Sequence, residues 1–112
     1  MIAPASHVLV VAPDADLRYS LAFLLKAEGF DVETSAAWPP EHHGTPFDAV
    51  VIDHTGLDRA YASDAQLTAL GRRAIILASH PEHFPALKTA TVVRKPLLDH
   101  TLLNALREAL AA

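Results

Sequence analysis

Short, uninterrupted runs of apolar residues constrain the fold of this 112-residue chain more than any other feature. Four such runs occur, and they are 7–11, 49–52, 74–78 and 91–93. Runs of this length that are rich in β-branched residues are typical of strands covered on both faces, as in a parallel sheet. Segment 30–33 instead alternates apolar and polar residues, which indicates a fifth strand at an edge of the sheet.

Two helices are predicted by apolar stripes with helical spacing. The first stripe lies between Asp14, an expected N-cap, and Gly29, an expected glycine just past the helix end. Its members are Leu17, Leu21, Leu24 and Leu25. The second stripe follows Asp99 as the expected N-cap, and its members are Leu102, Leu103, Leu106 and Leu110. Residues 59–70 are predicted as a further, less regular helix, anchored by Leu67 and Leu70.

Strands and helices therefore alternate, which predicts one α/β domain over residues 1–112. Two connections depart from a regular alternation. Segment 35–47 has 13 residues and contains three prolines, and segment 79–90 carries Pro81 and Pro85. Proline is poorly tolerated inside a helix, so each connection is expected to hold a turn or two of helix at most.

The composition excludes several functional classes. Thirteen acidic residues against nine Lys and Arg give a net charge of −4, which argues against a non-specific nucleic-acid binder. Because the chain has no cysteine, disulfides, thiolate zinc sites and thiol catalysis are excluded. No apolar stretch has the length of a membrane span, and the first residues lack the basic region of a secretory signal. A cytoplasmic protein without membrane contact is expected.

Five segments, together with the leucine-rich last helix, resemble in order and spacing the receiver domain of two-component response regulators. They are 8–11, 14–18, 24–32, 47–53 and 94–97. The resemblance implies a flavodoxin-like three-layer α/β sandwich with a five-stranded parallel sheet in the order 2-1-3-4-5. The two interrupted connections coincide with the second and fourth helices of that fold, which are therefore expected to be shortened here.

The resemblance also implies which residues carry the chemistry of the family. Asp53 matches the aspartate that accepts a phosphoryl group from a partner kinase, and Lys95 matches the lysine that pairs with the phosphoryl oxygens. Receivers hold Mg²⁺ with an acidic pair after the first strand. The matching positions here are Ala12 and Pro13, which have no side-chain oxygen. Mg²⁺ binding is therefore expected to be weak or absent.

Further switch positions also differ from the family pattern. The hydroxyl that follows the fourth strand in receivers falls on Ala78, with Ser79 beside it, and the aromatic switch position is Val92. The proline-containing turn after the phosphoacceptor is replaced by segment 54–58. Since the apolar framework is intact while the switch residues are altered, the sequence resembles a degenerate receiver, or pseudo-receiver.

Each candidate site residue has a structural interpretation as well. A structural ion pair between Asp53 and Lys95 is favoured over a working acceptor, and Asp14 is favoured as a helix cap over a metal ligand. The seven histidines, among them His42, His43, His80 and His83, lack zinc-site spacing. Arg72 and Arg73 are favoured as a solvated turn. Trp38 either covers the core or anchors a partner.

The sequence thus predicts a non-enzymatic signalling domain that contacts a histidine kinase or an adjacent signalling domain. Two alternatives stay open: a working receiver phosphorylated on Asp53, and a sensor of a nucleotide messenger. The first helix is expected to be the main docking surface, with Trp38 as a secondary anchor. Its exposed side is expected to carry Arg18, Lys26 and Glu28, while Leu17, Leu21 and Leu24 face the sheet.

Overall fold

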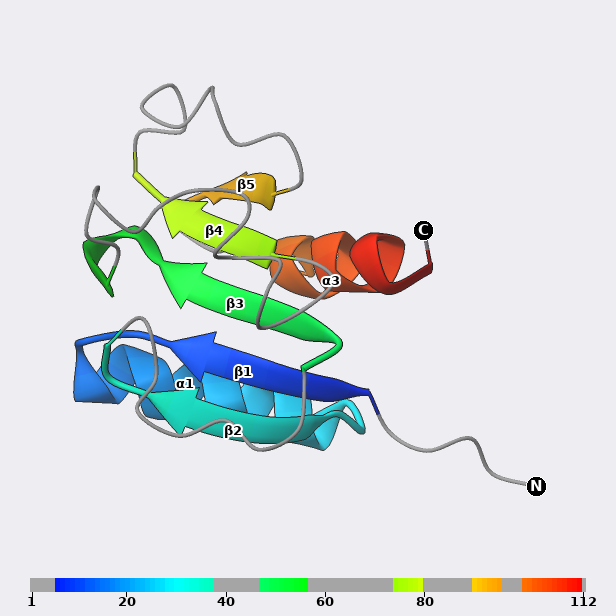
Figure 1. Ribbon diagram of the computed structural model, residues 1–112, viewed down its shortest axis with the longest axis horizontal. Coiled ribbons are helices and arrows are strands. Elements are labelled where there is room, and N and C mark those ends of the chain that lie inside the picture. Colours follow the sequence, from blue (N-terminus) through cyan, green and yellow to red (C-terminus); the bar gives the residue numbers. More distant parts are fainter. Residues whose placement is uncertain (1–5, 38–46, 57–73, 80–89, 96–99, 112) are drawn as a thin grey trace.

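Five parallel strands form a single sheet in the order β2-β1-β3-β4-β5 (Figure 1). The computed structural model describes residues 6–37, 47–56, 74–79, 90–95 and 100–111. The strands are β1 (His7–Val11), β2 (Asp31–Ser35), β3 (Ala49–Asp53), β4 (Ala74–Ala78) and β5 (Ala90–Arg94). The predicted topology is confirmed, and β2, which alternates in polarity, lies at an edge of the sheet.

The helices α1 (Ala15–Ala27) and α3 (Thr101–Ala111) pack on the same face of the sheet, α1 against β1 and β2 and α3 against β3, β4 and β5 (Figure 1). A 3₁₀ turn, η1 (His54–Gly56), follows β3. The core beneath the helices contains Val8, Val10, Val51, Ile75, Leu77, Leu25 and Leu106. Strand residues of opposite parity, such as Leu9, Val50, Ile52 and Ile76, are also buried. Both faces of the central strands are thus shielded from water, which explains their uninterrupted apolar runs.

Both ends of α1 have the predicted caps. The Asp14 carboxylate accepts a hydrogen bond from the Leu17 N–H at 2.9 Å, so Asp14 is a helix N-cap. At the other end Gly29 has φ of 96°, a conformation that glycine adopts without strain. The Phe30 N–H then donates to the Leu25 carbonyl at 3.1 Å and closes the last turn.

The prediction for the two sides of α1 is partly wrong. Leu21 is buried and Leu17 packs against the core, but Leu24 is 37% exposed. Leu24 follows Leu21 by three residues, which is about 60° less than one full turn of the helix. This offset places Leu24 at the margin of the buried face. Arg18 is half-buried rather than exposed, because its side chain folds back toward the start of the helix.

Several predicted features lie outside the described residues. They are the helix at 59–70, the greater part of segments 35–47 and 79–90, and Asp99. Of the helices that the structure describes, none combines the length and the apolar character needed to cross a membrane.

Candidate functional site

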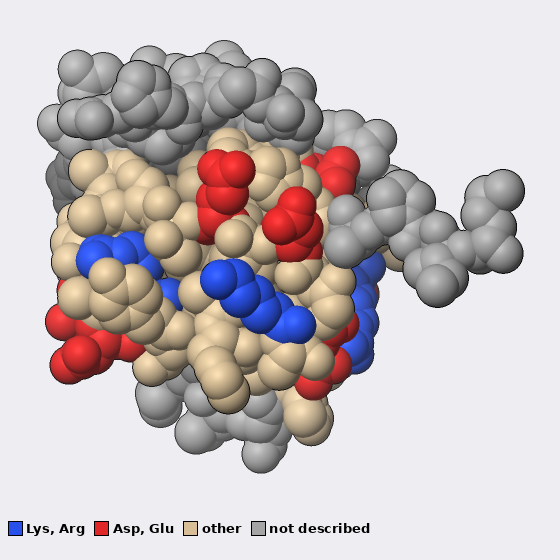
Figure 2. Space-filling model, turned by 90° about the horizontal axis from the view of Figure 1, so that it is seen from below, with Lys and Arg blue, Asp and Glu red and all other residues tan. Residues whose placement is uncertain are grey.

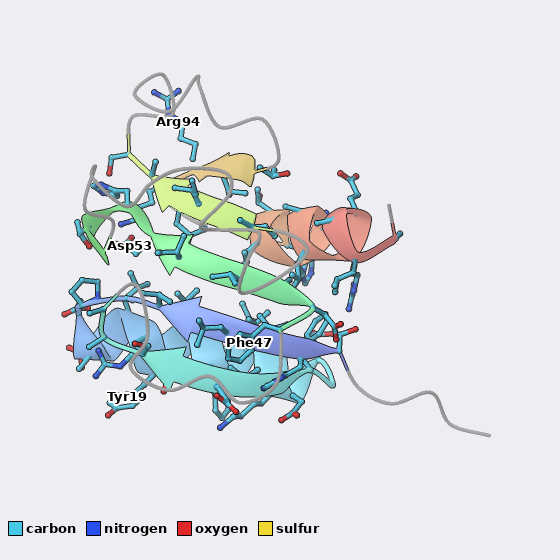
Figure 3. All side chains as sticks on the ribbon, in the orientation of Figure 1. Tyr19, Phe47, Asp53 and Arg94 are labelled. Carbon is cyan, nitrogen blue, oxygen red and sulfur yellow. The ribbon has the colours of Figure 1, made fainter. Side chains whose placement is uncertain are left out.

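Asp53 and Lys95 meet at the carboxyl ends of the strands. Asp53 is the last residue of β3, and Figure 3 shows it at that edge of the sheet. Lys95 directly follows β5, and its backbone N–H donates to the Ala78 carbonyl at 2.9 Å. This bond holds Lys95 beside the end of β4, one strand away from Asp53. Strand ends of open parallel sheets are where such folds carry their sites.

The carboxylate of Asp53 has a partner on each oxygen. The Lys95 ammonium forms an ion pair with Oδ1, and the Thr55 hydroxyl donates to Oδ2. The Thr55 backbone N–H donates to the same Oδ2 at 3.2 Å. The Asp53 side chain is 3% exposed and that of Lys95 is 25% exposed. The pair is thus one buried anion covered by a partly hydrated cation.

These contacts determine the protonation state of Asp53. Burial by itself raises the pKa of this carboxyl, because it disfavours the charged form. The hydrogen bonds from Lys95 and Thr55, together with the positive charge of Lys95, outweigh burial and hold the pKa of Asp53 below its ordinary value of 3.8. At neutral pH the site therefore contains a carboxylate and not a carboxylic acid.

Sequence reasoning assigned no role to Thr55. The spacing of Asp53 and Thr55 could have indicated this contact. A side-chain oxygen of Asp commonly accepts a hydrogen bond from the N–H two residues further along, and a Thr at that position adds a hydroxyl donor. The tight turn of η1 brings both donors of Thr55 onto Asp53 Oδ2. Thr55 thus occupies the oxygen that Lys95 leaves available.

A second contact that sequence reasoning missed lies in the loop after β1. The Arg18 guanidinium Nη1 donates to the Ala12 carbonyl at 2.8 Å and to the Pro13 carbonyl at 3.3 Å. Helical side chains lean toward the helix N-terminus, which allows an arginine in the first turn to reach back to this loop. A fixed positive charge therefore lies against the backbone oxygens of the two positions where receivers carry their acidic pair.

Among the described residues, the side chains around Asp53 do not supply the set of oxygens that Mg²⁺ prefers. This ion needs an octahedral set of hard oxygens and is usually held through more than one anionic ligand. Ala12 and Pro13 offer only carbonyl oxygens, and both accept from Arg18. Within the described ranges, no group of three or more His, Asp or Glu side chains is placed to hold a metal. Asp53 contributes one carboxylate here, and that carboxylate is already paired with Lys95 and Thr55.

The remaining predicted residues are placed as follows. Ala78 is buried at the end of β4, and Ser79, the next residue, is exposed. Val92 lies in β5, but its side chain lies outside what the structure describes. Also outside the described residues are Trp38, His42, His43, Arg72, Arg73, His80 and His83.

Comparison with known proteins identifies the fold. The sequence matches no protein-family model and no curated protein. The structure is similar to a CheY-like response regulator receiver domain from Methylobacillus flagellatus, with a TM-score of 0.76 and 20% identity over 94% of this chain and 98% of that one. It is also similar to the chemotaxis response regulator CheY4 of Vibrio cholerae, with a TM-score of 0.72 and 21% identity over 94% of this chain and 98% of that one.

A third similar structure is a putative pilus assembly-related protein from Burkholderia pseudomallei. Its TM-score is 0.69, with 23% identity over 99% of this chain and 93% of that one. Proteins of different kinds thus share this architecture, so the fold alone does not define a function. The sheet order and the likeness to several receiver domains together show that this chain has the flavodoxin-like fold of response-regulator receivers.

Proposed function

We propose that this chain is a receiver-like signalling domain that acts by protein contact in a two-component phosphorelay, with a histidine kinase or an adjacent signalling domain as its partner. In this proposal the magnesium-dependent phosphorylation switch is degraded, and the domain has no enzymatic activity of its own. The fold supports the receiver part of the proposal. The pairing of both Asp53 oxygens, beside a loop bound by Arg18, supports the loss of the switch.

The chemistry of phosphoryl transfer explains why this pairing matters. Transfer to a carboxylate requires an accessible attacking oxygen and positive charge that neutralises the transferring group. Asp53 is almost completely buried, and its two oxygens are engaged by Lys95 and Thr55. An incoming phosphoryl group would have to displace Lys95 or Thr55. Even if Lys95 stayed in place, it would be the one cation among the described residues that contacts Asp53. We infer that Asp53 and Lys95 form a structural ion pair.

The first test concerns magnesium. We expect millimolar Mg²⁺ to leave the melting temperature of the chain unchanged, because a ligand raises the stability of a fold only if it binds the native state. Differential scanning calorimetry with and without Mg²⁺, with Asp53→Asn as the matched control, measures this. A magnesium-dependent rise in the wild type that is absent from Asp53→Asn would contradict the proposal.

The second test concerns phosphorylation itself. After incubation with a small acyl phosphate donor and Mg²⁺, intact-protein mass spectrometry should show no stable phosphorylated fraction, since the attacking oxygens are engaged. Asp53→Asn again serves as the control for nonspecific modification. A substantial phosphorylated fraction that disappears in Asp53→Asn would establish the alternative, a working receiver with Asp53 as its acceptor.

A further inference from the structure

The outer side of α1 carries apolar side chains that the fold leaves uncovered. Phe23 is 78% exposed and Tyr19 is 63% exposed, and the partly exposed Leu24 lies at the margin of the same side. Figure 3 shows Tyr19 at the periphery of the molecule. Single exposed apolar residues are normal, but two neighbouring aromatic rings on a well-capped helix mark a contact surface.

Charged residues extend this pair of rings into a stripe. Asp16 lies three residues before Tyr19, and Lys26 lies three residues after Phe23. The four residues, which we call the α1 stripe, follow the spacing three, four, three, so they share one face of the helix. All four are exposed, and neither Asp16 nor Lys26 has an ion-pair partner within the part of the chain that the structure describes. Figure 2 views the side of the molecule formed by β2 and α1, where charges of both signs lie among uncharged surface.

The order of the stripe is symmetric about its centre. When a second copy of α1 runs antiparallel across it, with a two-fold axis at the level of Leu21, the spacing places Tyr19 of each copy opposite Phe23 of the other. The same rotation places Asp16 opposite Lys26 at both ends. In a parallel arrangement Asp16 would meet Asp16 and Lys26 would meet Lys26, which is unfavourable. The charges thus match the antiparallel orientation and not the parallel one, and the antiparallel contact is self-complementary, as a two-fold symmetric interface has to be.

We propose that α1 forms an antiparallel, two-fold symmetric dimer with a second copy of this chain through the α1 stripe. The Tyr19 ring is already restrained, because the Arg18 guanidinium lies over it at 5.1 Å from the ring centroid. Restraint before association lowers the entropic cost of binding. This inference does not depend on the proposed function, since it concerns the purified chain alone.

The small surface area of the α1 stripe limits the affinity of the dimer. An aromatic side chain buries roughly 150–250 Å² at most, so two rings from each copy and their neighbours remain under about 1,200 Å² of total buried surface. Interfaces of that size are weak and transient. We therefore expect a dimer that dissociates in the micromolar range and tightens at low ionic strength, where charge pairs are less screened.

Sedimentation equilibrium on the purified full chain tests the proposal. Phe23→Ser is expected to weaken self-association by about tenfold or more, as the loss of a central aromatic contact does. Glu108→Lys, a charge reversal at an exposed position of α3, is the matched control and should leave association unchanged. Circular dichroism melts verify that each variant is folded.

Complementary charge reversals test the register. Asp16→Lys alone and Lys26→Glu alone should each weaken self-association several-fold, because each homodimer then contains two like-charge pairs. An equimolar mixture of these two variants should form a heterodimer about as tight as the wild-type dimer, since all its end pairs are again opposite. Asp16 and Lys26 are ten residues apart on one helix, so no contact within a chain explains such recovery.

Three results would overturn the proposal. The first is a wild-type chain that stays monomeric at several hundred micromolar, which would leave the α1 stripe to a different partner such as a kinase. The second is self-association that Phe23→Ser does not weaken. The third is a mixture of the two charge variants that associates no better than either variant alone.

Discussion

Replacing Lys95 with methionine is expected to lower the free energy of unfolding by about 3 kcal/mol at pH 7, as removal of one partner of a buried ion pair generally does. Methionine has nearly the length of lysine, so the packing of its methylene groups is kept while the charge is lost. The Asp53 carboxylate, which is 3% exposed, would then stay buried with Thr55 as its remaining described partner. Urea unfolding followed by circular dichroism measures the change.

The double variant Asp53→Asn/Lys95→Met is the control for this effect. Its neutral amide still accepts from the Thr55 N–H, and no charge is left without a counterion in the interior. Much of the stability lost in Lys95→Met should therefore return, because neutral replacements of buried pairs are often well tolerated. A loss below about 0.5 kcal/mol for Lys95→Met would place the pair among ordinary surface salt bridges and contradict a structural role.

The second large effect is the loss of the same stabilisation in acid. Because the pKa of Asp53 is lowered by folding, the folded state binds this proton less readily than the unfolded state does. The contribution is therefore complete above the unfolded value of 3.8 and disappears as the pH falls below it through the folded pKa. We expect the stability that Asp53 contributes through its lowered pKa to be lost over this range.

Urea unfolding between neutral pH and about pH 2 measures this dependence. Asp53→Asn is the control, since it cannot titrate, and its stability should fall less steeply below pH 3.8 than that of the wild type. Equal slopes for the two proteins would show that other carboxylates cause the acid sensitivity and that the Lys95 pair contributes little.

The expected effects of Lys95→Met and of acid both concern whether Asp53 can accept a phosphoryl group. A buried carboxylate that is needed for stability is a poor phosphoacceptor, because its modification would break the contacts with Lys95 and Thr55. The exposed aromatic side chains of α1, Tyr19 and Phe23, are instead available for contact with another protein.

The local sequence predicted most strands and both ends of α1, because these features depend on interactions between residues that are close in the chain. Uninterrupted apolar runs specified doubly covered strands, and the alternation at 30–33 specified the edge strand β2. Asp14 and Gly29 marked the ends of α1 because capping is decided by neighbouring backbone groups. The placement of Asp53 and Lys95 at the same edge came from the receiver resemblance and holds in the structure.

The side-chain partners required the tertiary structure, because they depend on directions that a one-dimensional pattern does not contain. Arg18 was expected in solvent, yet its backward lean brings it onto the Ala12 and Pro13 carbonyls. Leu24 was expected in the core, yet the small angular drift of the helix exposes it together with Phe23.

Local sequence patterns determined the individual strands and the ends of α1, since hydrophobic periodicity and capping are properties of adjacent residues. The resemblance to receivers supplied the strand order and the residues that stand at the strand ends. Only the tertiary structure decided that both oxygens of Asp53 are occupied and that the aromatic pair of α1 is uncovered. Both facts arise from the packing of segments far apart in the chain, which sets the burial of a charge and the exposure of a ring.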